Sequence, residues 1–121
     1  MKKAGIITLF GEYNFGNRLQ NYAVQEVLKK KGLDVQTIKY MPKDTKPPET
    51  NDILGKERLQ RFRKFNEKIN FAKETLYSDV ETPNNFGEEY DYIILGGDQI
   101  WNHTFTKSFS DKAIRLICSN T

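Results

Sequence analysis

Two glycine-containing segments combine residue types that could bind a ligand. The first extends from Gly11 to Arg18 with the sequence GEYNFGNR, and the second begins at the pair Gly96 and Gly97 and ends at Asn102 with the sequence GGDQIWN. Glycine lets a backbone or a ligand approach closely, whereas carboxylate, amide and guanidinium groups form hydrogen bonds with anions and sugar hydroxyls. These two segments are therefore the first candidates for a functional site.

The first segment has two glycines five residues apart, as in the phosphate-binding loop of nucleoside triphosphatases. That loop requires Lys followed by Ser or Thr, but Asn17 and Arg18 occupy those positions, so we expect that the protein is not an ATPase. The dinucleotide fingerprint Gly-x-Gly-x-x-Gly is also absent from the sequence. What remains is a glycine turn before a helix, whose backbone amides attract phosphate or carboxylate and whose cap is Asn17 or, alternatively, Asn14. Gly16 is either part of this anion site or simply a turn glycine.

The second segment offers a carboxylate on Asp98 and two amides, on Gln99 and Asn102, which suit the hydroxyls of a sugar. Trp101 either stacks on a sugar or fills an interface between sheet and helix, and Asp98 could instead cap the following helix. His103 is the single histidine of the chain and has no carboxylate or cysteine partner nearby in sequence. It is therefore weak evidence for catalysis.

The spacing of apolar residues predicts the first elements that position these segments. Residues 6–10 form a short continuous apolar run, typical of a strand that is covered on both faces. From residue 17 to Gly32 the pattern predicts a helix, and residues 34–40 alternate as a second strand. A strand, a helix and a strand of these lengths form a right-handed parallel pair. The apolar face predicted for the helix consists of Leu19, Tyr22, Ala23, Val27 and Leu28.

The rest of the chain is less regular. Residues 41–55 contain three prolines and predict a mobile loop, and residues 56–70 predict a second helix with an apolar stripe. Residues 71–89 show a mixed pattern, residues 90–95 predict the third strand, and residues 103–121 are an uncertain tail. The basic residues of the second helix form either an anion-binding surface or, more commonly, an ordinary solvated face. They are Lys56, Arg58, Arg61, Arg63 and Lys64.

The two glycine-containing segments follow the first and the third predicted strand. Parallel strands carry their ligands at the carboxyl ends, in the crevice where the loops emerge. The two segments should therefore meet at one edge of the sheet. We predict an α/β fold for residues 1–121, a single Rossmann-like domain with three α/β/α layers and a small, mainly parallel sheet.

Composition narrows the class of protein. The 121 residues are about the length of one domain, and 37% hydrophobic with 29% charged residues is typical of neither a disordered nor a membrane protein. A net charge of +3 does not indicate a nucleic-acid partner. The lone Cys118 excludes an intrachain disulfide and a zinc site with several cysteines. The short N-terminal apolar run has no cleavage pattern, so we expect a cytoplasmic protein without a membrane span.

In this order, the two segments resemble the N-terminal region of the polysaccharide pyruvyl transferase family. In that family a Gly-Ser pair stands where this chain has Gly96 and Gly97, and a Val stands at Ile100, so both departures are mild. The matching stretches are GIIT at 5–8, NFGN at 14–17, LQNYAVQ at 19–25, residues 28–35, and YDYIILGGDQIWN at 90–102.

The resemblance implies one half of a double-Rossmann, glycosyltransferase-B-like architecture with the active site between two domains. It implies transfer of a pyruvyl group from phosphoenolpyruvate, the donor substrate, to hydroxyls of a sugar or polysaccharide precursor. We expect no cofactor, and the sequence predicts no metal site. Asp98 is the implied catalytic residue, which would contact or deprotonate an acceptor hydroxyl. The implied substrate-binding residues are Asn14, Gly16, Asn17, Arg18, Gly96, Gly97, Gln99, Trp101 and Asn102.

Family members are about two such domains long, so we expect a truncated N-terminal half that is inactive alone. Its partner would be a missing C-terminal domain or a second copy of the chain that covers the apolar face. The alternative is a stand-alone Rossmann-like binding module for a phosphorylated ligand or a protein partner.

Overall fold

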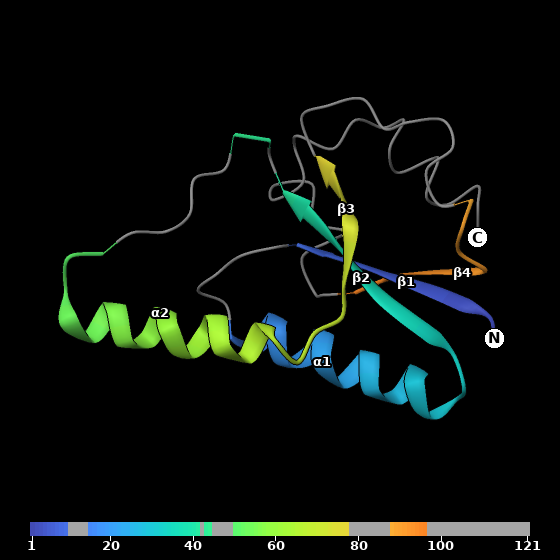
Figure 1. Cartoon of the computed structure of the whole chain (residues 1–121), viewed down its shortest axis with the longest axis horizontal. Coiled ribbons are helices and arrows are strands. Elements are labelled where there is room, and N and C mark those ends of the chain that lie inside the picture. Colours follow the sequence, from blue (N-terminus) through green and yellow to red (C-terminus); the bar gives the residue numbers. More distant parts are fainter. Residues whose placement is uncertain (10–14, 42, 45–49, 78–87, 97–121) are drawn as a thin grey trace.

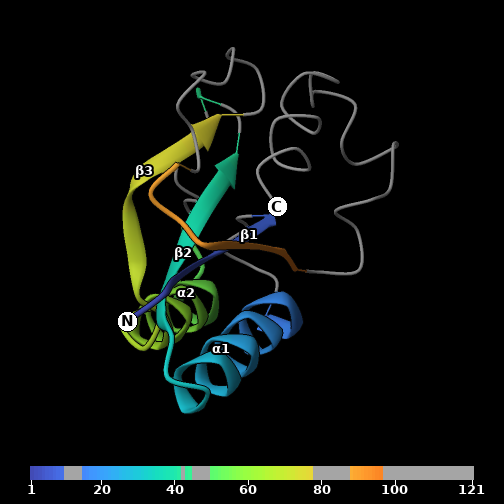
Figure 2. The same cartoon turned by 90° about the vertical axis from the view of Figure 1, so that its right-hand side faces the viewer.

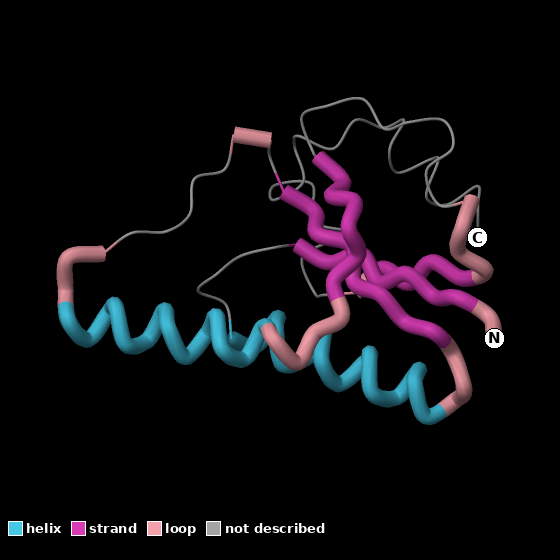
Figure 3. The backbone as a smooth tube through the Cα atoms, in the orientation of Figure 1, coloured by secondary structure: helices cyan, strands magenta, loops and turns pink. Residues whose placement is uncertain are grey.

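The computed structural model describes residues 1–9, 15–41, 43–44, 50–77 and 88–96. Four strands and two helices make up these residues (Figures 1 and 3). In chain order the elements are β1 (Lys3–Leu9), α1 (Phe15–Lys30), β2 (Asp34–Met41), α2 (Ile53–Asn66), β3 (Phe71–Tyr77) and β4 (Tyr92–Leu95).

The four strands form one parallel sheet in the order β3-β2-β1-β4. Strands β1 and β2 pair from Lys3 opposite Asp34 to Leu9 opposite Tyr40, and the β2–β3 pairing shifts register once beyond Thr37. Both helices lie on the same face of the sheet, as Figure 2 shows. The predicted Rossmann-like α/β fold with a small parallel sheet is confirmed, although the described residues contain only two of the three predicted layers.

Local features explain where the elements end. Gly32 has φ +84°, a left-handed conformation that favours glycine, and its N–H donates to the Lys29 carbonyl at 3.0 Å, which ends α1. Asp52 caps α2, because its carboxylate accepts the backbone N–H of Leu54 at 3.4 Å. On β1, a Cβ at Gly5 would lie 3.1 Å from side-chain atoms of both Ile38 and Tyr90, so a larger residue there would crowd these two side chains.

Apolar side chains cover both faces of the sheet. On the face that carries the helices, Ala4, Ile6 and Val35 are buried against Val24 and Leu28 of α1. Because successive residues of a strand point to opposite faces, the neighbouring positions build a second cluster on the other face. This second cluster consists of the buried residues Ile7, Ile38, Tyr40, Leu76 and Tyr90.

The sequence patterns missed one strand and misplaced several boundaries. Strand β3 was not predicted, because Leu76 is its one fully buried residue and Lys73 and Glu74 are exposed, so the apolar pattern is weak. The loop predicted over 41–55 was too long, since Met41 ends β2 and residues 53–55 open α2. Helix α2 ends at Asn66 rather than at residue 70. The mobility of the loop was not tested, and residues 103–121 lie outside the described residues.

The apolar face predicted for α1 is wrong in part. Leu19 and Val27 are each 54% exposed, and Ala23 is exposed as well. The buried residues of the helix are instead Arg18, Asn21 and Gln25. Helix α1 therefore turns a polar stripe towards the sheet, and the reason lies in the hydrogen bonds described below.

Candidate functional site

The carboxyl ends of β1 and β4 lie side by side. These strands pair in parallel from Ala4 opposite Tyr92 to Ile7 opposite Leu95, and the Gly96 N–H donates to the Ile7 carbonyl at 2.9 Å. The strand order reverses here, because the chain progresses from β1 to β2 and β3 in one direction and adds β4 on the other side. Open α/β sheets bind ligands at such a reversal, outside the carboxyl ends of the strands. The predicted parallel arrangement, which brings the ends of these two strands to one edge, is confirmed. Residues 10–14 and 97–102 lie outside the described residues, so the meeting of the two glycine-containing segments stays a prediction.

Asn17 connects helix α1 to this edge. The hydroxyl of Thr8, near the end of β1, donates to Oδ1 of Asn17 at 3.0 Å, and Thr8 is 2% exposed. The prediction that Asn17 caps the helix is wrong, because α1 begins at Phe15 and Asn17 lies in its first turn. The alternative cap, Asn14, lies outside the described residues. The buried hydroxyl of Thr8 fixes the Oδ1 end of the Asn17 amide towards the strand.

Neither of the two described glycines of the site has the positive φ that would favour glycine. Gly16 is an exposed residue of the first turn of α1, so it is not a turn glycine as one interpretation held. Gly96 does not have positive φ, and a Cβ there would meet Ile6 Cγ2 at 3.7 Å and the Ile7 carbonyl oxygen at 3.9 Å, which are ordinary contacts. A side chain at Gly96 is therefore compatible with the strand end itself.

Arg18 points into the interior of the protein. It is 2% exposed, and its guanidinium carbon lies 5.6 Å from the ring centres of both Phe62 on α2 and Phe71 on β3. Its Nη1 donates to Oδ1 of Asn21 at 3.4 Å. In this position the guanidinium holds α1 against α2 and β3 through cation–π contacts. The structure thus places Arg18 beneath the helices rather than at the exposed edge where a ligand was expected.

A buried polar network, which sequence reasoning missed, extends from Arg18 along α1. The Asn21 amide donates to Thr37 Oγ1 at 2.9 Å, and the Gln25 amide donates to the Lys68 carbonyl at 2.9 Å while its Oε1 accepts the Asn70 N–H at 2.8 Å. These bonds connect α1 to β2 and to the turn before β3. The signal in the sequence was the polar spacing 18, 21 and 25, which marks one face of a helix.

Most of the predicted site residues lie outside the described residues. Their positions are not tested by the structure, so their predicted roles stay predictions. The same applies to His103 and Cys118. The site residues concerned are Asn14, Gly97, Asp98, Gln99, Trp101 and Asn102.

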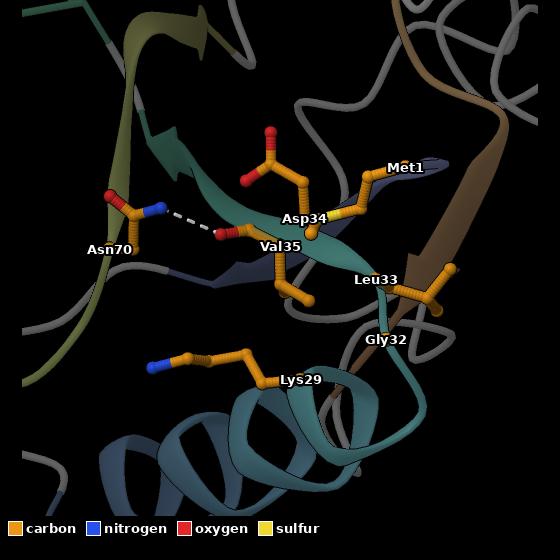
Figure 4. Close-up of a pocket in the computed structure, with 7 residues that line it drawn as sticks. All are labelled: Met1, Lys29, Gly32, Leu33, Asp34, Val35 and Asn70. Atoms are coloured by element: carbon orange, nitrogen blue, oxygen red, sulfur yellow. Dashed lines mark hydrogen bonds between the residues drawn. The ribbon is translucent and has the colours of Figure 1, made fainter.

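A pocket of about 390 Å³ lies at the opposite, amino edge of the sheet (Figure 4). Lys29 and Asp34 are its charged side chains, and the Asn70 amide, which donates to the Val35 carbonyl at 2.7 Å, closes one side. Met1, 96% exposed, also lines it. Because ligands of parallel sheets bind at the carboxyl ends, and because this pocket gathers few functional groups, we favour the β1–β4 edge as the candidate site.

Tyr90 precedes β4 and belongs to the apolar cluster on the face away from the helices. Burial, with the negative charges of Glu89 and Glu74, raises the pKa of Tyr90 to about 12. Its hydroxyl donates to Oε1 of Gln36 at 3.1 Å. Tyr90 therefore stays neutral over the physiological pH range and serves as a structural residue.

The described part of the chain shows neither a metal-binding cluster nor a membrane-spanning helix. Within it, no group of three His, Cys, Asp or Glu side chains is arranged to hold a metal ion. Neither of the described helices is long and apolar enough to cross a membrane.

Comparison with known proteins gives one result. No curated protein and no solved structure matches the chain. A family model described as polysaccharide pyruvyl transferase matches residues 14–119, which is most of the chain and includes the second glycine-containing segment and residues 14–18 of the first. The match agrees with the resemblance found in the sequence. The chain belongs to the polysaccharide pyruvyl transferase family.

Proposed function

We propose that this chain takes part in the transfer of a pyruvyl group from phosphoenolpyruvate to hydroxyls of a polysaccharide or its precursor. The edge of the sheet at the carboxyl ends of β1 and β4 is the proposed substrate site. One observation carries the proposal. The strand order reverses between β1 and β4, and the two glycine-containing segments, which the family model matches from residue 14 onward, follow these two strands in the sequence.

The proposed reaction sets the chemical requirements of the site. Two acceptor hydroxyl oxygens bond to C2 of phosphoenolpyruvate, its methylene carbon gains one hydroxyl proton to become a methyl group, and the bond from C2 to the phosphate oxygen breaks. Inorganic phosphate leaves with the second proton, and the product is a ketal. Such a site needs donors for an anionic substrate and a base for an acceptor hydroxyl.

The first turn of α1 supplies the proposed donors. Its backbone N–H groups lack partners within the helix and carry the positive end of the helix dipole, which favours a phosphate or carboxylate. Gly16 has no side chain that would keep an anion away from this turn. Asn17 is half-buried and held by Thr8, so it is the side chain of this turn that we propose to contact the anion. Arg18, buried between Phe62 and Phe71, has a structural role in this proposal.

The segment after β4 supplies the proposed acceptor site. Asp98 is the proposed base, while Gln99, Asn102 and Trp101 would bind the sugar through amides and an aromatic face. The glycosyltransferase-B-like architecture that the resemblance implies would place a second domain opposite this edge. The ligand contacts proposed here require only β1, α1 and β4 with the segments that follow the two strands.

Binding of phosphoenolpyruvate by the chain tests the donor half of the proposal. Isothermal titration should detect binding, and Asn17→Ala should weaken it about tenfold, because a hydrogen bond to a charged group is lost. Gln20→Ala is the matched control, since Gln20 is an exposed amide on the same helix. Equal affinities of the two variants would remove Asn17 from the site. The expected inactivity, truncation and partner domain or homodimer stay predictions on which this assay does not depend.

Turnover tests the acceptor half. The chain is incubated with phosphoenolpyruvate and sugar acceptors, and NMR follows the methyl signal of the ketal. Where turnover occurs, Asp98→Asn should lower the rate about 100-fold or more, as expected for loss of a general base. Asp34→Asn is the matched control, because the exposed Asp34 lines the pocket at the amino edge. A larger loss in the Asp34 variant would move the site to that pocket.

A further inference from the structure

Helix α2 is attached to the protein by only part of its length. Phe62 contacts Phe15 with ring centres 4.7 Å apart, and Phe65 contacts Tyr22 at 5.6 Å. Leu59 is the first buried residue of the helix, and the six residues before it have no buried side chain. In Figure 1 the N-terminal turns of α2 extend away from α1 and from the sheet. The helix therefore presents a projecting end to the surroundings.

Two large aliphatic residues are exposed on this projecting end. Ile53 is 74% exposed and Leu54 is 72% exposed, and among the large hydrophobic side chains that the structure describes only Met1 is more exposed. Adjacent exposed aliphatic residues on a protruding helix contribute nothing to the core of this domain. Such residues are typical of a surface that meets another apolar phase or a partner.

The same helix carries more than the whole net charge of the protein. Residues 53–68 contain six basic and two acidic residues, a net charge of +4, whereas the entire chain has +3. The rest of the chain is therefore slightly acidic, so the positive charge is concentrated on α2 and the turn that follows it. All six cations are exposed, and they are Lys56, Arg58, Arg61, Arg63, Lys64 and Lys68.

Three of these cations, Lys56, Arg61 and Lys64, share one side of the helix with the two aliphatic residues. With 3.6 residues per turn, Lys56 and Lys64 lie close to the row of Ile53, on the side opposite the buried Phe62. Arg61 falls on the row of Leu54, seven residues on. Because exposed aliphatic and cationic side chains lie next to one another on α2, a single partner would contact both kinds. A purely electrostatic surface would present the cations alone.

We propose that this outward side of α2, called the α2 surface and formed by Ile53, Leu54, Lys56, Arg61 and Lys64, docks the protein on a membrane that contains anionic lipids. Lipid headgroups would pair with the cations, and the aliphatic side chains would enter the boundary between headgroups and acyl chains. A nucleic acid would engage the cations alone and leave Ile53 and Leu54 in water. The attachment is peripheral and does not depend on the substrate site.

Vesicle sedimentation with the whole chain tests this proposal. The protein should bind vesicles of phosphatidylcholine that contain phosphatidylglycerol, should not bind phosphatidylcholine alone, and should bind more weakly as salt rises. Arg61→Gln with Lys64→Gln should weaken binding about 30-fold, since each cation near an anionic surface contributes about fivefold. Ile53→Ser with Leu54→Ser should weaken it about tenfold or more without any change of charge.

The matched control removes two cations from another exposed site. Lys30→Gln with Lys31→Gln lowers the net charge equally at the end of α1 and should change binding less than about twofold. All substituted residues are exposed, and thermal unfolding followed by circular dichroism checks that each variant folds. Equal losses in the two charge variants would overturn the proposal. Unchanged binding of the Ile53 and Leu54 variant would also overturn it, and competition by single-stranded RNA in that case would identify a nucleic-acid surface instead.

Discussion

The two faces of the sheet are packed with different chemistry. The face away from the helices is filled by Ile7, Ile38 and Leu76 and their apolar neighbours. The face under α1 combines a small apolar cluster with a network of buried amides, hydroxyls and one guanidinium, among them Asn21 and Thr37. The first face can be stabilised by any residues of suitable size and shape, whereas the second depends on particular donors meeting particular acceptors. This difference predicts how each face responds to substitution.

Truncation on the apolar face should have the largest effect. Ile38 is 1% exposed on a central strand, so Ile38→Ala leaves a cavity and should lower the free energy of unfolding by about 2–5 kcal/mol. Urea denaturation measures the loss. A loss below about 1 kcal/mol would show that this face is loosely packed and would weaken the contrast between the faces.

Loss of one amide on the helix face should have the next largest effect. Gln25→Ala removes the acceptor of the Asn70 N–H and the donor to the Lys68 carbonyl, so we expect a loss of about 1–3 kcal/mol in urea denaturation. Gln20→Ala, an exposed change on the same helix, should stay within about 0.5 kcal/mol. Equal effects of the two variants would mean that the network adds no stability.

High pH should weaken the apolar face through Tyr90. The pKa of Tyr90 is about 12 in the folded protein, against 10.0 for an ordinary tyrosine. The stability that the neutral, buried Tyr90 side chain contributes is therefore complete below pH 10 and is lost as the pH rises towards 12. At pH 11 the loss should be about 1 kcal/mol. Unfolding of Tyr90→Phe and of the wild type across this range measures it. Parallel pH curves for the two proteins would contradict the assigned role of burial.

Thr8 and Thr37 are both buried on the face of the sheet that carries the helices, but only Thr8 should affect ligand binding. Thr8→Val and Thr37→Val each remove one hydroxyl and should each cost about 0.5–1.5 kcal/mol of stability. Only Thr8 holds Asn17, so only Thr8→Val should weaken phosphoenolpyruvate binding, and it should have no further effect when Asn17→Ala is already present. Calorimetric titration of the single and double variants tests this coupling. Additive losses of affinity would show that Thr8 does not act through Asn17.

Much of the fold could be predicted because apolar runs mark strands that are covered on both faces. Apolar runs and alternation predicted strands β1, β2 and β4. The helical spacing of apolar residues predicted both helices. Strand β3 was not predicted, since its exposed Lys73 and Glu74 interrupt the pattern and its place in the sheet depends on pairing with β2. Pairing between residues distant in sequence is not encoded in local periodicity.

The candidate site was predictable in its location but not in its side chains. Parallel strands necessarily bring their carboxyl ends to one edge, so the side-by-side ends of β1 and β4 followed from the fold class. The burial of Arg18 did not, because a charged residue at a helix start is normally assigned to solvent or to a ligand. Its place depends on Phe62 and Phe71, which the chain brings from distant positions.

The guanidinium of Arg18 between Phe62 and Phe71 has a consequence for how the helices align. Purely apolar helix surfaces can shift relative to one another at little cost in free energy. The buried guanidinium of Arg18 always carries its charge, so an arrangement that removed it from Phe62 and Phe71 would leave a buried charge without these contacts. We therefore expect shifted alignments of α2 on α1 to be higher in free energy because of Arg18, so that Arg18 selects one alignment of the two helices. Exchanging it for an uncharged residue of similar volume would then leave the helices attached while loosening the selection of a single arrangement.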